Sequence, residues 1–261
     1  MLLRYLFART SSRAAKRLSF QTRGAEVSRL EGFSDAVFGF AITLLVISVN
    51  APATSAELLA MRHAVLPFVA SFAALFGLWR AQFNFFRRYG LEDDVTIRLT
   101  GTLLMVVLLA IYPLKFLCTF MLDVLPVAIL AGDDSMRRTM PLESLPKVLL
   151  FYAVGFTGIT LIFSRLYRHA ATCRDALGLT EMELFDTRMI QRRWLAMSLG
   201  GTALMAWCGI LVATSQSGER GIQWTVGYLM GFPIMMATNL FQRRALRRLA
   251  LERAELAGKV E

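Results

Sequence analysis

The sequence is divided into apolar blocks of roughly 20 residues that are separated by clusters of charged residues. A helix of that length spans the hydrocarbon core of a bilayer, because each residue adds about 1.5 Å of rise. Over the whole chain 56% of the residues are hydrophobic and 18% are charged, whereas about a quarter of the residues of a soluble domain are charged. Block length and composition together predict an all-α integral membrane protein.

The blocks predict six transmembrane helices per subunit, forming a single helical domain. Their ranges are Phe33–Val49, Ala64–Phe86, Thr96–Met121, Leu145–Tyr167, Trp194–Thr214 and Gln223–Phe241. Glycine or proline interrupts the fourth and sixth blocks, but membrane helices tolerate such residues where neighbouring groups satisfy the backbone.

The basic residues predict the orientation. Of the 29 Lys and Arg residues, 22 lie on one side of the predicted helices and five on the other, while Arg80 and Lys115 lie inside spans. By the positive-inside rule, this bias places both termini in the cytoplasm. The net charge of +10 then follows from topology and from attraction to anionic lipid headgroups, and it does not indicate a nucleic-acid partner. We expect a basic N-terminal arm over residues 1–28, a six-span domain over 29–242 and a basic cytoplasmic tail over 243–261.

Sequence patterns of catalysis, metal binding and cofactor binding are lacking. The two histidines, His63 and His169, are predicted to lie on opposite membrane faces. The cysteines Cys118, Cys173 and Cys208 are isolated, with no C-x-x-C pair. No H-E-x-x-H, G-x-S-x-G, P-loop or G-x-G-x-x-G pattern is present in the sequence. We therefore expect no catalytic residue, no metal site and no bound cofactor.

Two short polar patterns are typical of helix starts. Glu92, Asp93 and Asp94 precede the third span and are interpreted as its N-terminal cap rather than as metal ligands. Thr180 and Glu183 have the spacing of a capping box, which predicts a short helix that runs through Arg188.

Ionisable residues inside a predicted span are costly, so each needs a partner or a function. Asp35 lies about one turn into the first span. A pair with Arg80 or Arg29 would neutralise it, and Ser34 with the first-turn amides would also stabilise it, so that a simple capping role stays open. Lys115 lies near the outer end of the third span, where its ammonium group is expected to extend to the headgroups.

One face of the first span combines apolar and polar residues. Phe40, Thr43, Ile47 and Asn50 are spaced by three, four and three residues, and Leu44 lies beside them. A stripe that faced lipid would have no use for Thr43. The spacing fits either a packed helix interface or a water-filled lumen.

The R-x-x-x-F-S-D sequence at residues 29–35, followed directly by AVFGFAITLLV, resembles the signature that opens the first helix of the transmembrane-protein-175 family. That family comprises bacterial and lysosomal potassium channels. FGLWRAQFNFF in the second span is similar to the tryptophan-centred stretch of the family, and LLAIYPLKF in the third is similar to its proline-containing stretch. The residues that this resemblance assigns to a network around the motif are Arg29, Phe33, Ser34, Asp35, Trp79, Arg80 and Gln82.

The resemblance implies a homotetramer in which the first helix of each subunit lines a pore. Rings of apolar side chains would replace the carbonyl filter of ordinary potassium channels. The implied rings are Phe40, Leu44 and Ile47, and Thr43 would be tied to selectivity. Potassium would be the permeant ion rather than a bound cofactor. A single six-span unit further implies the bacterial inner membrane.

Three positions differ from the family pattern. Position 40 is Phe where Ile or Leu is usual, Gln82 replaces a His, and Ser48 replaces an acidic residue near the outer mouth. The leading interpretation is a potassium-preferring cation channel with an apolar constriction. The alternative is a non-conducting membrane scaffold on the same fold, its pore plugged by Phe40. A secondary transporter would need a charged or broken-helix site at mid-membrane, where the sequence offers Thr43 and scattered glycines.

Overall fold

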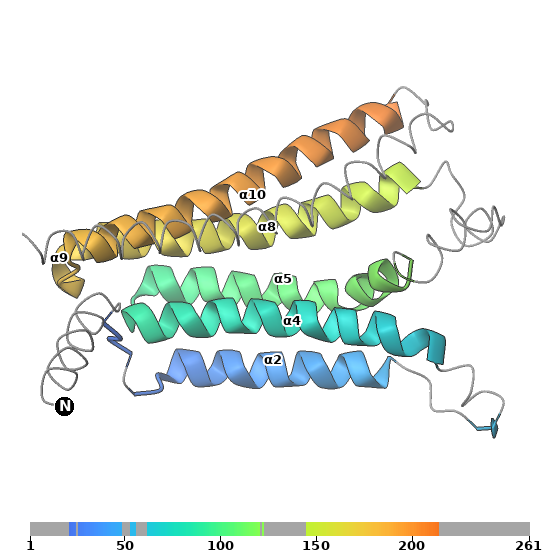
Figure 1. Ribbon diagram of the computed structural model, residues 1–261, viewed down its shortest axis with the longest axis horizontal. Coiled ribbons are helices and arrows are strands. Elements are labelled where there is room, and N and C mark those ends of the chain that lie inside the picture. Colours follow the sequence, from blue (N-terminus) through green and yellow to red (C-terminus); the bar gives the residue numbers. More distant parts are fainter. Residues whose placement is uncertain are drawn as a thin grey trace, which may run out of the picture. The chain divides into compact units, whose positions relative to one another are not determined.

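The computed structural model describes residues 21–24, 26–48, 53–55, 62–120, 122 and 145–213. Within these residues the regular structure is helical (Figure 1). The elements are α2 (Arg29–Ile47), α4 (Arg62–Tyr89), α5 (Asp94–Thr119), α8 (Leu145–Thr172), α9 (Arg174–Leu177) and α10 (Glu181–Ala213). The sixth predicted span, the basic tail and the first 20 residues of the predicted arm lie outside the described residues.

Four described helices are long and apolar enough to cross a membrane. These stretches are Arg29–Ile47, Val65–Tyr89, Asp94–Ile111 and Lys147–Thr172. They correspond to the first four predicted spans, so the all-helical, multi-span class is confirmed. The fifth predicted span forms the second half of α10.

Local sequence sets the helix starts that position α2 and α5. The Ser28 side chain accepts a hydrogen bond from the Glu31 amide at 3.0 Å and so caps α2. The Asp93 side chain accepts one from the Thr96 amide at 3.1 Å and caps α5, as predicted. Between α4 and α5 the chain reverses at Gly90, whose φ of +59° is a conformation that glycine adopts without strain.

The capping box at Thr180 and Glu183 forms in both directions. The Thr180 amide donates to Glu183 Oε2 at 3.1 Å, and the Glu183 amide donates to Thr180 Oγ1 at 3.3 Å. The expected short helix through Arg188 is wrong, because α10 continues from Glu181 to Ala213 without a break. No glycine or proline lies between Glu181 and Leu199 to end it.

The described residues fall into two compact units, one within Met1–Ser135 and Gly155–Ser198, the other within Met136–Val154 and Leu199–Glu261. In the first unit α2, α4 and α5 pack pairwise against one another (Figure 1). Its aromatic core includes Phe85, whose ring centroid lies 5.1 Å from that of Tyr89 and 5.4 Å from that of Tyr167. In the second unit the rings of Phe151 and Tyr152 meet edge to face at 5.9 Å.

Candidate functional site

Helix α2 has a buried face and an open face. The buried residues recur every three or four positions, which places them on one side of a 3.6-residue helix. They are Glu31, Ser34, Phe38, Ala41 and Leu45. This side packs against α4 and α5.

The residues predicted to line a pore lie on the opposite face. Phe40 is 58% exposed and Ile47 is 71% exposed, while Thr43 is also exposed and Leu44 is partly exposed. At 100° per residue, these four positions fall within one sector of the helix roughly opposite the buried residues. A single subunit therefore leaves this mixed apolar and hydroxyl face without a covering helix among the described residues.

The Thr43 hydroxyl has a defined orientation. Its Oγ1 donates a hydrogen bond to the Phe40 carbonyl oxygen at 2.7 Å. A hydroxyl has one proton to donate and two lone pairs that accept. Because the proton is used inside the helix, the lone pairs remain for a partner outside it, such as water or a cation.

A buried contact between Ser34 and Gln82 joins α2 to α4. Gln82 Nε2 donates to Ser34 Oγ at 3.1 Å, and Ser34 Oγ in turn donates to the Leu30 carbonyl at 2.8 Å. Both side chains are almost fully buried. Gln82 Oε1 has no hydrogen-bond partner among the described residues. Position 82, where the family pattern has a histidine, therefore holds a glutamine whose side-chain NH₂ group donates to Ser34.

Asp35 is bound by an indole rather than by an arginine. Trp79 Nε1 donates to Asp35 Oδ1 at 2.8 Å. Within the part of the chain that the structure describes, Asp35 makes no ion pair with Arg29 or Arg80, both of which are exposed. The predicted Asp35–Arg pair is therefore not formed within one subunit. Phe33, the remaining motif residue, is 59% exposed.

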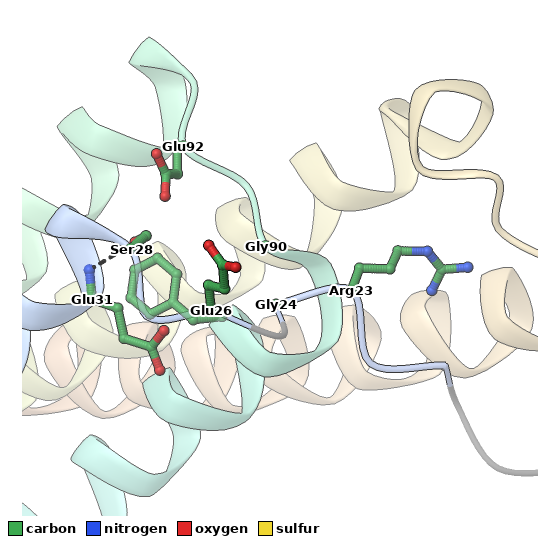
Figure 2. A pocket seen from close by; sticks show the side chains of 8 residues that line it. Arg23, Gly24, Glu26, Ser28, Glu31, Gly90 and Glu92 are labelled. Atoms are coloured by element: carbon green, nitrogen blue, oxygen red, sulfur yellow. Dashed lines mark hydrogen bonds between the residues drawn. The ribbon is translucent and has the colours of Figure 1, made fainter.

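An acidic cavity of about 340 Å³ lies at the start of α2 (Figure 2). The carboxylates of Glu26, Glu31 and Glu92 are among its lining groups. Its wall includes Gly24, whose carbonyl accepts a hydrogen bond from Arg87 Nη1 at 2.9 Å. A Cβ at Gly24 would lie 2.4 Å from the Phe86 carbonyl oxygen, so only glycine allows this approach of the chain to α4.

The segment that precedes α2 is bound to the start of α10. Arg23 Nη2 donates to Glu183 Oε2 at 2.8 Å, and the Gln21 amide donates to Glu183 Oε1 at 2.8 Å. The Arg23 guanidinium also donates to the carbonyls of Leu177 at 2.6 Å and Gly178 at 3.1 Å. Burial by itself raises the pKa of Glu183, but the hydrogen bonds from Arg23, Gln21 and Thr180 outweigh it and lower that pKa to about 2.

Lys115 was expected to extend its ammonium group to the lipid headgroups, but in the structure that group has a partner within the protein. Its ammonium group donates to the carbonyl oxygen of Ser48, the C-cap residue that follows α2. A cation is favourable at a helix C-terminus because the last carbonyls there carry partial negative charge. Lys115 thus connects the C-terminal end of α2 to α5.

Contacts between residues that are distant in the chain leave no mark in the sequence. Arg23 and Glu183 are separated by 160 positions, and Asp93 and His169 by 76. No local pattern marks such a pair. For the Arg23–Glu183 pair, the sequence signal was the capping-box spacing of Thr180 and Glu183, which marks Glu183 as a residue at the start of a helix.

Comparison with known proteins gives one consistent result. A family model described as the endosomal/lysosomal potassium channel TMEM175 matches residues 29–111. A potassium channel from Marivirga tractuosa is 38% identical over 172 residues, covering 65% of this chain and 70% of that protein. A potassium channel from Chamaesiphon minutus is 30% identical over 162 residues, covering 59% of this chain and 70% of that protein.

A solved structure has the same fold. The crystal structure of a variant of the potassium channel MtTMEM175, in complex with a nanobody–MBP fusion protein, aligns with a TM-score of 0.75 and 31% identity. The alignment covers 87% of this chain and 97% of that chain. The match of the family model begins at Arg29, where α2 begins.

Proposed function

The chain belongs to the TMEM175 family of potassium channels, and from this we propose that it is a potassium-preferring cation channel whose constriction is lined by α2 of each of four subunits. The family consists of ion channels, which confirms the prediction that the chain is not an enzyme. The observation that carries the proposal is the open face of α2, with Phe40, Thr43 and Ile47 exposed and Leu44 partly so.

Exposure of apolar residues alone would fit a lipid-facing helix, since Leu109 on α5 is 70% exposed as well. On α2 the hydroxyl of Thr43 lies within the stripe formed by Phe40, Leu44 and Ile47, which supports a lumen, although the exposed Thr102 on α5 shows that a hydroxyl bonded to its own helix does not by itself exclude lipid. The Thr43 proton is used within the helix, so the lone pairs of its Oγ1 remain for an outside partner, and lipid tails offer neither a donor nor a cation. A lumen that holds water and cations offers both.

Four copies of an apolar ring would make a constriction that conducts only when it is wet. Rings at Phe40, Leu44 and Ile47 would exclude water when the helices approach and admit it when they move apart. Four Thr43 hydroxyls between these rings would replace part of the hydration shell of a passing ion. This is the source of the proposed preference for potassium.

The contacts at both ends of α2 suit a helix that must keep its position. Trp79 and Gln82 hold its inner end through Asp35 and Ser34, and Lys115 holds its outer end. The cavity at the start of α2 is lined by three carboxylates and by one guanidinium, that of Arg23, a balance that would favour cations near an entrance. We further propose six spans with both termini in the cytoplasm, in a bacterial inner membrane with anionic headgroups.

A second candidate function rests on Phe40. This side chain is 58% exposed on the open face, and four phenyl rings would fill more of a narrow lumen than the usual Ile or Leu. If the rings close the path permanently, the assembly is a non-conducting scaffold on the same fold.

Flux into liposomes distinguishes the two candidates. Purified full-length protein is reconstituted and potassium and sodium uptake are measured in parallel for the parent and for Phe40→Leu. Phe151→Leu is the matched control, because Phe151 is a similarly exposed phenylalanine (60%) on α8. A channel gives potassium uptake above sodium uptake, and Phe40→Leu increases it while Phe151→Leu does not.

Subunit number is measured on the same samples. The expected particle has about four times the chain mass of 29.2 kDa. Tetramers that give no flux in the parent or in Phe40→Leu would contradict the channel and leave the scaffold.

A further inference from the structure

Three side chains of different metal-binding types converge near the start of α5. Asp93 caps α5, His169 lies in the last turn of α8, and Cys173 follows the end of α8. Each residue offers one ligand atom, and these three atoms lie within 4.8 Å of one another: a carboxylate oxygen, an imidazole nitrogen and the thiol sulfur. All three residues belong to the first compact unit, so a single subunit supplies the whole cluster.

The helix geometry explains the convergence. His169 and Cys173 are four residues apart, and such residues lie on the same face one turn apart. Asp93 is held from a second direction, since its Oδ1 accepts hydrogen bonds from the amide and the hydroxyl of Thr96. Its other oxygen, Oδ2, is thereby turned toward His169 Nε2, with which it is hydrogen bonded.

From this geometry we propose that Asp93, His169 and Cys173 form a binding site for a divalent transition-metal ion, zinc in the first instance. Cys173 Sγ lies 3.7 Å from His169 Nε2. Tetrahedral zinc with a Zn–S bond of about 2.3 Å and a Zn–N bond of about 2.05 Å would separate these two atoms by about 3.6 Å. The sulfur and nitrogen are therefore already at the separation that a shared zinc ion requires.

The ligand types select the metal. Thiolate and imidazole ligands favour zinc, cobalt and related ions, whereas magnesium and calcium take oxygen ligands. Binding would replace the hydrogen bond between Asp93 and His169 and would release the thiol proton of Cys173. The carboxylate, at 40% side-chain exposure, leaves a route for an ion from solvent and a fourth position for water.

The hydrogen bonds to the far side of Asp93 support this role. Metal-bound carboxylates in proteins are themselves held by hydrogen bonds, which fix their orientation. Thr96 supplies two such bonds. A metal here would connect the start of α5 to the end of α8, away from the open face of α2. The proposal is independent of the proposed conduction path.

Cobalt titration of the reduced full-length protein in detergent tests the site. Cobalt bound by a thiolate gives a charge-transfer absorption band, and four-coordinate cobalt gives intense visible bands. The expected result is a thiolate band that saturates at one cobalt per chain and disappears when zinc is added. No thiolate band under excess cobalt would overturn the proposal and leave the cluster as an Asp93–His169 pair beside a thiol.

Matched variants assign the band to its ligands. Cys173→Ser should abolish it, and His169→Gln and Asp93→Asn should each weaken cobalt affinity by at least about tenfold, the scale at which outer-shell changes already act. Asparagine still caps a helix, so Asp93→Asn preserves the start of α5. Cys118→Ser and His63→Gln are the controls and should leave the band unchanged. A band that survives in Cys173→Ser would contradict the assignment.

A measurement on the parent alone guards against variants that fail to fold. Thiol alkylation with and without zinc, followed by mass spectrometry of peptides, identifies which cysteine the metal protects. The site predicts selective protection of Cys173. Equal labelling of Cys173 in both samples, or protection confined to Cys118, would overturn the proposal.

Discussion

At the scale of single residues, buried polar groups fix α2 against α4. Ser34 accepts from Gln82 and donates to its own helix, while Gln82 Oε1 has no partner among the described residues. A buried polar group without a partner costs about 1–3 kcal/mol. The pair is therefore more sensitive to loss of one member than to loss of both.

Ser34→Ala should lower the free energy of unfolding by about 1–3 kcal/mol, because it leaves the Gln82 amide without an acceptor. Adding Gln82→Leu should recover part of that loss, since an apolar side chain of similar length needs no partner. The measurement is the apparent Tm in detergent for both single variants and the double variant. Strictly additive losses would show that the two residues are not coupled.

Thr43 is the residue on which ion preference should depend. Thr43→Ala removes the outward lone pairs, and loss of an interaction worth about 0.5–1.5 kcal/mol corresponds to a roughly two- to tenfold lower ratio of potassium to sodium flux. Thr102→Ala is the control, because Thr102 is also exposed and donates its hydroxyl to its own helix, at 2.8 Å to Arg98. An unchanged ratio in Thr43→Ala would remove Thr43 from the selective path.

At the scale of elements, the chain before α2 is held by the first turn of α10. Gln21 and Arg23 bind Glu183 in its ionised form. The pKa of Glu183 in the folded protein, about 2, lies below its ordinary value of 4.5. Stabilisation by this carboxylate is therefore complete above pH 4.5 and is lost as the pH falls toward 2.

Glu183→Gln should be less stable than the parent at pH 7 by about 1.5–3 kcal/mol, the range for hydrogen bonds to charged groups. The difference should shrink below pH 4.5 as the parent carboxylate takes up a proton. The readout is the apparent Tm at several pH values, with Glu181→Gln, an exposed residue of the same turn, as control. A difference that stays constant down to pH 3 would contradict the role given to Glu183.

The helices themselves follow closely from sequence. Block length and hydropathy predict α2, α4, α5 and α8 to within a few residues, because a membrane span is determined by local apolar content. The length of α10 could not be predicted from hydropathy, because its first half is charged and its second half is apolar. Only the apolar half of such a helix stands out in the sequence as a membrane span.

At the scale of the whole molecule, the contacts between distant segments are the part that sequence does not predict. The repeat of Phe40, Thr43 and Ile47 was visible as a shared helix face, and the structure leaves that face open. Charge and helix position left two kinds of partner open for Asp35, an arginine or Ser34 with the first-turn amides. The neutral Trp79 indole is the donor instead, because packing of α2 on α4 brings it to the carboxylate. The Asp93, His169 and Cys173 cluster likewise needs the fold to assemble it.

We expect the open face of α2 to become the wall of a water-filled path when subunits assemble. Exposed faces on other helices would instead contact lipid. Ile47 and Leu109 give a matched comparison, since they are 71% and 70% exposed on α2 and α5 respectively. Each is replaced by cysteine in the full-length protein, and the parent serves as the control for native cysteines.

The decisive measurement is potassium flux into liposomes before and after a charged, water-soluble thiol reagent is added. The reagent should slow flux through Ile47→Cys and leave flux through Leu109→Cys and the parent unchanged. Mass spectrometry shows whether the reagent has modified the cysteine in Ile47→Cys. Unchanged potassium flux through a modified Ile47→Cys would contradict a pore lined by α2.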